Sequence, residues 1–277
     1  MQTLVSGVML GCLYAFVALG FAMILGISHS LNLAHGEIVT LGGYIGYGLW
    51  AGSGLHPLLL IPVAAAALLP LAFLWHWMLD RLPAPRALPS LALTFGWALL
   101  LQALMRVLWP GPHRLISSPS LGASTRFGWV TLNHGRAVVA LAALGAIGAL
   151  WLAVTRTRWG RAIRATGLDR DAAALAGINV YAATRITLVL AMALSGAAGV
   201  LLATTHYVYP TAGVELTLLA IVLTIWAGVG RLLTVLLAGL LLGIAESLTV
   251  AISGPAWREP VIACLLLASL LARPPVD

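Results

Sequence analysis

The stretch LVSGVMLGCLYAFVALGFAMILGI, residues Leu4 to Ile27, carries no charged side chain and is long enough for one α-helix to cross the hydrocarbon core of a bilayer. It lacks a basic segment in front of it and exceeds the apolar core of a signal peptide, so we expect it to be kept as a helix. Similar apolar runs follow near 58–79, 88–109, 137–155, 186–204, 214–229, 234–252 and 259–272. The sequence therefore predicts an all-α, polytopic transmembrane helical bundle with about eight or nine spans.

The composition excludes an ordinary soluble domain. Hydrophobic residues make up 61% of the 277 residues and charged residues 8%, whereas a soluble domain has about 25% charged residues. All 15 basic residues are arginine and lie mostly between apolar runs, which indicates contact with membrane lipid and no nucleic-acid partner. Cys12 and Cys264 fall inside apolar runs and suggest no disulfide. We expect residues 1–277 to form one transmembrane domain.

Residues 34–51 form a further segment that has two interpretations. Polar residues stand at its start, and it contains Gly36, Gly42, Gly43, Gly46 and Gly48. It is either a discontinuous or re-entrant helix, or a glycine-rich helix that packs tightly against its neighbours through small residues. Both interpretations stay open at the level of sequence.

The distribution of arginine predicts how the chain is oriented. If all nine segments cross and the polar stretch 160–179 is cytoplasmic, the N-terminus lies outside and the C-terminus inside. Four further arginines are then cytoplasmic, as the positive-inside rule requires: Arg81, Arg86, Arg231 and Arg273. If segment 34–51 does not cross, the N-terminus moves inside and the count falls to eight.

A polar cluster at the start of segment 34–51 consists of Asn32, His35, Gly36 and Glu37. An amide, an imidazole and a carboxylate can satisfy one another at a helix start inside the bilayer, and a glycine permits close backbone approach. We favour a structural role for this cluster over direct contact with a substrate, and both remain open. No metal-ligand spacing such as HExxH accompanies His35, so no metal is expected.

Two more carboxylates, Glu215 and Glu246, fall within apolar runs. One interpretation makes them gate or pathway residues, because ionisable groups at membrane depth are costly and functional. In the other, which we favour, each pairs with a hydroxyl or backbone donor such as that of Thr217 or Ser247.

The longest polar stretch is GRAIRATGLDRDAAALAGIN, from Gly160 to Asn179. Asp169 is a suitable helix N-cap, and Gly177 is a suitable stop. Between them, Ala172, Leu175 and Ala176 recur at the spacing of one helical face. The loop at about 156–184 is therefore predicted to present a short amphipathic helix to a cytoplasmic partner.

The chain has no nucleophile elbow, no Walker A loop, no dinucleotide-binding fingerprint and no paired cysteine motif. We therefore expect no catalytic residue and no enzyme activity. We also expect no cofactor bound by this chain, so energy for any transport would come from another subunit.

Several blocks together resemble the permease subunits of ABC importers for branched-chain amino acids. They are GISHSLNLAHGEIVTLGGY (Gly26 to Tyr44), GRAIRAT…D…AALAGIN, GVLLATTHYVYP and GLLLGIAES. The blocks are spread over nearly the whole chain, and their order between apolar spans is specific.

The resemblance implies a multi-pass protein of the bacterial inner membrane that works beside a second, different permease chain. It also implies ATP-binding subunits that use ATP and Mg²⁺, and a periplasmic substrate-binding protein. The cytoplasmic loop would couple to the ATPase, since Asp171-Ala172-Ala173 and Gly177 resemble the E-A-A-x-x-x-G core of importer permeases. The coupling residues so implied are Gly160, Arg161, Arg164, Asp169, Asp171, Ala172, Leu175 and Gly177.

One departure and two alternatives accompany this resemblance. Where the family carries a glycine-rich GGxGSxxGAxxGG turn, this chain has AGVGRLLTVLLAG at 227–239. Permeases for urea and short amides are similar and are not separated by these motifs. An ion-coupled secondary transporter that uses Glu37, Glu215 or Glu246 is the alternative from another class.

Overall fold

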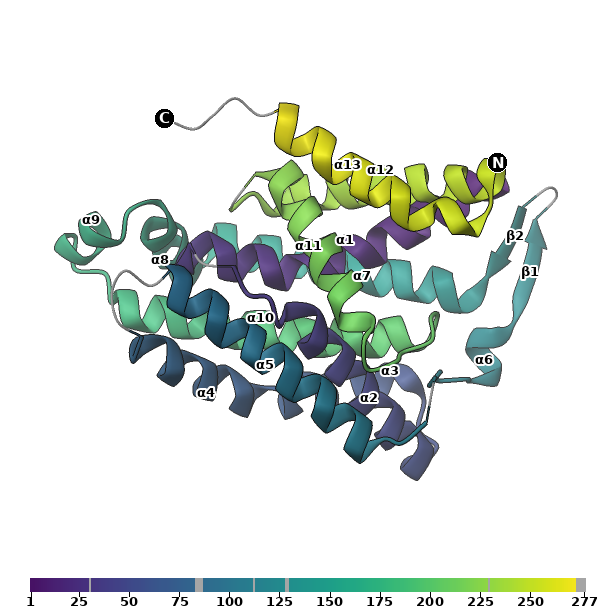
Figure 1. Ribbon diagram of the computed structural model, residues 1–277, viewed down its shortest axis with the longest axis horizontal. Helices are drawn as coiled ribbons and strands as arrows, with labels where there is room; N and C mark the ends of the chain where they lie inside the picture. The colour runs from purple at the N-terminus through teal and green to yellow at the C-terminus, as the bar shows by residue number, and fades with distance from the viewer. Residues whose placement is uncertain (30, 83–86, 112, 128–129, 229, 273–277) are drawn as a thin grey trace.

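The computed structural model describes residues 1–29, 31–82, 87–111, 113–127, 130–228 and 230–272. Arg86 and Arg273, which the sequence assigns to the cytoplasmic side, lie outside these ranges. Most long helices run along one axis of the molecule, so that the connecting segments collect at its two ends (Figure 1). Two helices, near the N-terminus and at 180–203, lie inside the bundle and are buried along most of their length. The core is thus built around these two helices.

In chain order, the elements are α1 (Gln2–Ser28), α2 (His35–Ser53), α3 (Pro57–Ala67), α4 (Leu69–Asp80), α5 (Ala87–Leu108), α6 (Pro119–Gly122), β1 (Ser124–Phe127), β2 (Val130–Asn133), α7 (His134–Arg156), α8 (Arg158–Leu168), α9 (Arg170–Leu175), α10 (Val180–Ala203), α11 (Ala212–Ala227), α12 (Leu232–Ser253), the 3-10 helix η1 (Pro255–Trp257) and α13 (Arg258–Ala272).

Every apolar segment expected from the sequence is largely helical, which confirms the all-α polytopic bundle. In the described part of the chain, six helical stretches are long and apolar enough to cross a membrane: Gln2–Ser28, Pro57–Asp80, Leu88–Leu108, His134–Arg156, Val180–Ala203 and Leu232–Ser253. The second of these is divided at Leu68 into α3 and α4. Pro70 in the first turn of α4 explains the division, because proline lacks the N–H that a continuous helix would use.

Helices α1 and α12 run antiparallel in close contact because glycines leave room for the backbones. A Cβ built on Gly11 would lie 2.6 Å from the carbonyl oxygen of Gly239, and one on Gly7 would lie 2.8 Å from Cα of Ile244. Since helices in a bilayer gain no hydrophobic driving force from each other, such close van der Waals contact is what holds them together.

Helix α2 shows features of both interpretations of segment 34–51. It is continuous from His35 to Ser53 and packs closely on α10, where a Cβ on Gly42 would lie 2.7 Å from Cα of Gly196. It begins, however, inside the bundle, because Nε2 of His35 lies 2.9 Å from the carbonyl oxygen of Val17 in the middle of α1. Helix α2 therefore starts level with the middle of α1 and not at its end.

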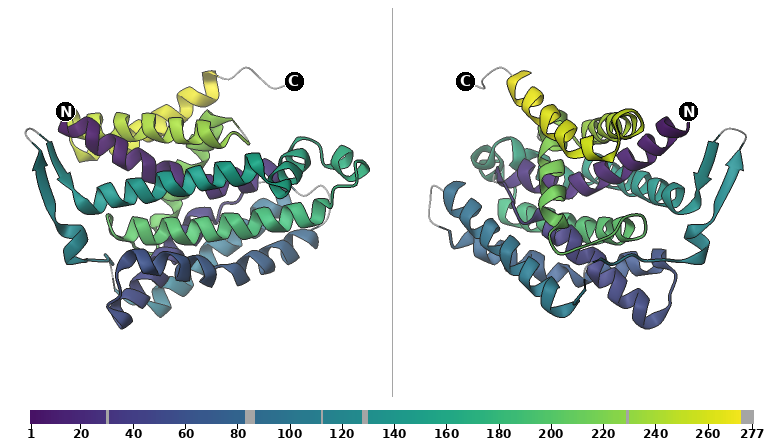
Figure 2. Two further views of the ribbon diagram at one scale, coloured as in Figure 1. Left: turned by 180° about the vertical axis from the view of Figure 1, so that it is seen from behind. Right: turned by 45° about the vertical axis from the view of Figure 1, so that its right-hand side comes forward.

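The two ends of the bundle differ. At one end, β1 and β2 form a two-stranded hairpin, and the side chain of Gln2 exchanges hydrogen bonds of 2.9 and 2.7 Å with the backbone of Thr131. At the other end, α8 and α9 project from the bundle, and the two views of Figure 2 place them opposite the hairpin and the N-terminus. The hairpin lies between the apolar runs near 88–109 and 137–155, where the sequence analysis predicted no strand.

The close contact between α1 and α12 generates a test. Gly11→Ala should lower the free energy of unfolding by about 1–3 kcal/mol, because the new methyl group has no space beside Gly239. Gly145→Ala is the matched control, since nothing lies within 4 Å of a Cβ there. Thermal unfolding of both variants in mild detergent checks this. Equal midpoints for the two variants would contradict the proposed packing.

Candidate functional site

A polar junction lies where α2 begins, and we use that name for Asn32, His35, Gly36, Glu37, Gln102 and Thr217. All six residues are buried. They come from the α1–α2 connection, α2, α5 and α11, four segments that are far apart in the sequence. The junction therefore ties these segments together inside the bundle.

Asn32 and His35 fix the start of α2. Oδ1 of Asn32 accepts a hydrogen bond of 3.0 Å from the backbone N–H of Ala34, which makes a turn just before the helix. The His35 ring bonds to the carbonyl of Val17 on α1, and it meets the ring of Phe21 edge to face with ring centroids 5.6 Å apart. His35 therefore has its partner in the backbone of a neighbouring helix.

Helices α2 and α11 meet at their N-terminal ends with almost no side chain between them. A Cβ on Gly213 would lie 2.6 Å from the backbone nitrogen of Glu37. The hydroxyl of Thr217 accepts a hydrogen bond of 2.9 Å from the N–H of Gly36, and donates one of 3.3 Å to the carbonyl of Leu33. Thr217 thus satisfies backbone groups that the half-way start of α2 leaves without helical partners.

Glu37 connects this junction to α5. Its Oε1 accepts a hydrogen bond of 2.9 Å from Nε2 of Gln102, and Oε1 of Gln102 accepts a long one of 3.4 Å from Arg106. The chain of contacts leads from a carboxylate that is 1% exposed toward an arginine at the surface. The sequence did not predict Gln102 as a partner, because a lone glutamine in an apolar run gives no sign of what it faces.

Three atoms of the junction have no hydrogen-bond partner among the described residues: Oε2 of Glu37, Nδ1 of His35 and Nδ2 of Asn32. Buried polar atoms are nearly always paired, so three such atoms in one place set this junction apart from the rest of the bundle. Within the described ranges, no group of three or more His, Cys, Asp or Glu is placed so that it could hold a metal ion.

The other two carboxylates lie away from the junction. Glu246 on α12 is buried and accepts a hydrogen bond of 3.1 Å from the hydroxyl of Tyr14. Glu215 on α11 is exposed and accepts one of 2.7 Å from the hydroxyl of Tyr209. The preferred interpretation named hydroxyl partners, but it pointed to Thr217 or Ser247 and missed both tyrosines.

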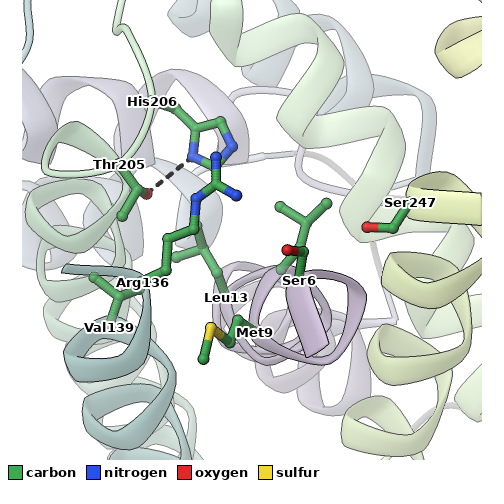
Figure 3. Close-up of a pocket in the computed structure, with 9 residues that line it drawn as sticks. Ser6, Met9, Leu13, Arg136, Val139, Thr205, His206 and Ser247 are labelled. Atoms are coloured by element: carbon green, nitrogen blue, oxygen red, sulfur yellow. Dashed lines mark hydrogen bonds between the residues drawn. The ribbon is translucent and has the colours of Figure 1, made fainter. Parts of the chain in front are cut away.

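A small cavity of about 80 Å³ opens near the hairpin end between α1, α7, α12 and the segment before α11. Figure 3 shows the guanidinium of Arg136 beside the ring of His206, whose Nδ1 lies 2.9 Å from the hydroxyl of Thr205. Ser6 and Ser247 also line this cavity. The cavity is therefore lined by the positively charged Arg136, by several hydroxyl groups and by apolar side chains, at the end of the bundle opposite α9.

The polar stretch at the other end folds as two helices, where the sequence predicted one. Asp169 caps α9, as predicted, and accepts hydrogen bonds of 2.9 Å from the N–H groups of Asp171 and Ala172. Gly177 ends it with a φ of +80°, a conformation that glycine adopts most readily. The preceding helix α8 carries Arg161 and Arg164 and packs tightly at Gly160 against Val154.

The predicted apolar face of α9 points away from the bundle. Leu175 is 90% exposed, and Ala172 and Ala176 line the same face, whereas Ala173 is the buried residue of this helix. The helix lies at the far end of the molecule, beyond the last turn of α7 (Figure 1).

Together, the apolar spans and the polar junction inside them define a multi-pass membrane protein. Residues 3–270 match the family described as "Branched-chain amino acid transport system / permease component", and the chain belongs to that family.

Curated relatives agree over nearly the full length. The high-affinity branched-chain amino acid transport system permease protein LivH of Escherichia coli K12 is 29% identical, over 99% of this chain and 94% of LivH. The corresponding permease protein BraD of Pseudomonas aeruginosa is 30% identical, over 99% of this chain and 94% of BraD. Both relatives are described as permease proteins of a transport system. No solved structure matches the chain significantly.

The Glu37–Gln102 contact generates a second test. Glu37→Ala should lower the free energy of unfolding by about 1–3 kcal/mol, because it leaves a buried amide without its acceptor. Glu37→Gln keeps an acceptor oxygen and should retain most of the stability. Thermal unfolding in detergent, with Glu215→Ala as an exposed-carboxylate control, checks both expectations. A Glu37→Gln variant as unstable as Glu37→Ala would refute the structural role.

Proposed function

We propose that this chain is the permease subunit of an ABC importer that moves branched-chain or related amino acids across a bacterial inner membrane. The family membership and the names of LivH and BraD support this substrate class. Separate subunits bind ATP and Mg²⁺ and supply the energy. A second, different permease chain completes the pathway, and a periplasmic protein delivers the substrate.

The observation that carries the proposal is the exposed apolar face of α9. This helix stands between two long spans, α7 and α10, and offers Leu175 with small alanines around it. A short helix with such a face fits a hydrophobic groove on a partner, where a large side chain anchors and small ones allow close approach. An ATP-binding subunit on the cytoplasmic side is the proposed partner, so the hairpin end is the periplasmic end.

Coupling follows from the connection between α9 and α10. Only Ala176 to Asn179 separate the two helices, and Oδ1 of Asn179 accepts a hydrogen bond of 2.9 Å from the N–H of Ala182 in the first turn of α10. A partner that moves α9 therefore acts on α10 through a short, capped connection. Because α10 packs on α2 through glycines, this movement reaches the polar junction.

Ion-coupled transport is the second candidate, and the buried Glu37 is the observation that favours it. The uptake of labelled leucine by whole cells distinguishes ATP-driven import from ion-coupled transport. ATP-driven import should stop when ATP is depleted and should survive an uncoupler as long as ATP is maintained. The reverse pattern would establish the ion-coupled mechanism.

Competition experiments test the substrate. Isoleucine and valine should reduce the uptake of labelled leucine, and urea should not. Competition by urea would instead assign the chain as a short-amide permease.

The docking of α9 is tested by one side chain. Leu175→Asp should lower uptake about tenfold or more, since it removes the anchor and buries a charge in the contact. Leu175→Met keeps an apolar anchor and should transport normally. Both variants should insert and unfold like the parent, because Leu175 contributes little to the fold.

Co-purification gives the second readout of this test. The ATP-binding subunits should remain with the parent chain and with Leu175→Met, and should be lost from Leu175→Asp. Full uptake by Leu175→Asp, with the ATPase still bound, would exclude α9 as the docking element.

A further inference from the structure

A second cavity, of about 290 Å³, lies where the end of α1, helix α8 and the start of α12 meet. We call it the basic cavity. Its lining includes Met23, Ile163, Leu168 and Leu232 together with the two arginines Arg164 and Arg231. It is at the same end of the bundle as α9, but α9 contributes no residue to it.

The two arginines of the basic cavity have no acidic partner within the described residues. Those residues contain one ion pair, between His76 and Asp80, and it involves neither arginine. Arg164 donates a single long hydrogen bond of 3.5 Å to the carbonyl of Thr155, which leaves most of its donors open. The cavity therefore combines two available guanidinium groups with an apolar wall.

Arginines beside an apolar wall favour one kind of anion over another as the occupant of the basic cavity. A free inorganic anion would use the guanidinium groups and leave the apolar wall in contact with water. An anionic phospholipid uses both parts, because its phosphate binds arginine and its acyl chain covers the apolar side chains.

The position of the basic cavity supports the same occupant. Helix α8 carries several arginines and an exposed Trp159, the composition of a helix that lies at a membrane surface.

We propose that the basic cavity binds one anionic phospholipid of the adjacent leaflet, with its phosphate between Arg164 and Arg231. The lipid then links α8 to the start of α12, two elements that are far apart in the sequence. A bound lipid at this place stabilises the position from which α9 projects.

The test measures lipid binding to the full-length chain, purified with any subunits that accompany it. After delipidation in detergent, phosphatidylglycerol and phosphatidylethanolamine are added separately and the bound lipid is counted by native mass spectrometry. The parent chain should retain one phosphatidylglycerol in preference to phosphatidylethanolamine. Arg231→Gln should bind it about tenfold more weakly, as expected for the loss of one charge-assisted contact.

Two further variants test separately how the charge and the apolar wall contribute to lipid binding. Arg231→Lys keeps the positive charge and should bind more tightly than Arg231→Gln. Ile163→Trp places a larger side chain in the cavity and should also reduce the retention of phosphatidylglycerol, although both arginines remain. Arg156→Gln is the matched control, because Arg156 is exposed at the same end and does not line the cavity. Lipid binding is compared only among variants that elute like the parent chain.

Three results would overturn the proposal. One is equal binding of the two lipids by the parent chain. Another is an equal loss of phosphatidylglycerol in Arg231→Gln and Arg156→Gln, which would show a general charge effect. The third is displacement of the lipid by millimolar inorganic phosphate, which would make the site one for soluble anions.

Discussion

A bilayer offers no water to backbone groups, so every N–H and C=O inside it needs a partner within the protein. This constraint acts most strongly where α2 begins in the middle of the bundle. Asn32 accepts from the N–H of Ala34 just before the helix, and Thr217 accepts from the N–H of Gly36 in its first turn. The His35 side chain bonds to the backbone of α1 and holds the start of the helix in place. The polar junction exists because the chain becomes helical at that depth.

The same constraint explains why glycine is concentrated on α2. A helix start that must reach a hydroxyl on α11 has to bring the two backbones together, and a Cβ on Gly36 would lie 2.7 Å from the nitrogen of Thr217. On its far side, α2 lies equally close to α10. The helix is thus held between two others by backbone contact.

Sequence reasoning succeeded where the decisive information is local. Apolar length located the helices, and the Asp169 cap and the Gly177 stop defined α9, because each depends on residues within a few positions. It failed for contacts between distant segments: Tyr14 and Glu246 are 232 residues apart, and Glu37 and Gln102 are 65 apart. Which polar groups meet is decided by how the helices pack, and no spacing along the chain records that.

The two interpretations of residues 34–51 could not be separated from the sequence for a related reason. Glycines and a polar start are required both by a closely packed helix and by a helix that begins inside the bundle, and α2 is both. Helices α2 and α11 both start at the junction, and their first turns lie against each other there. A bundle of unbroken spans would have no helix start at this depth, because each span would satisfy its own backbone groups along its length. The buried polar side chains of the junction are therefore needed only because two helices begin inside the bundle.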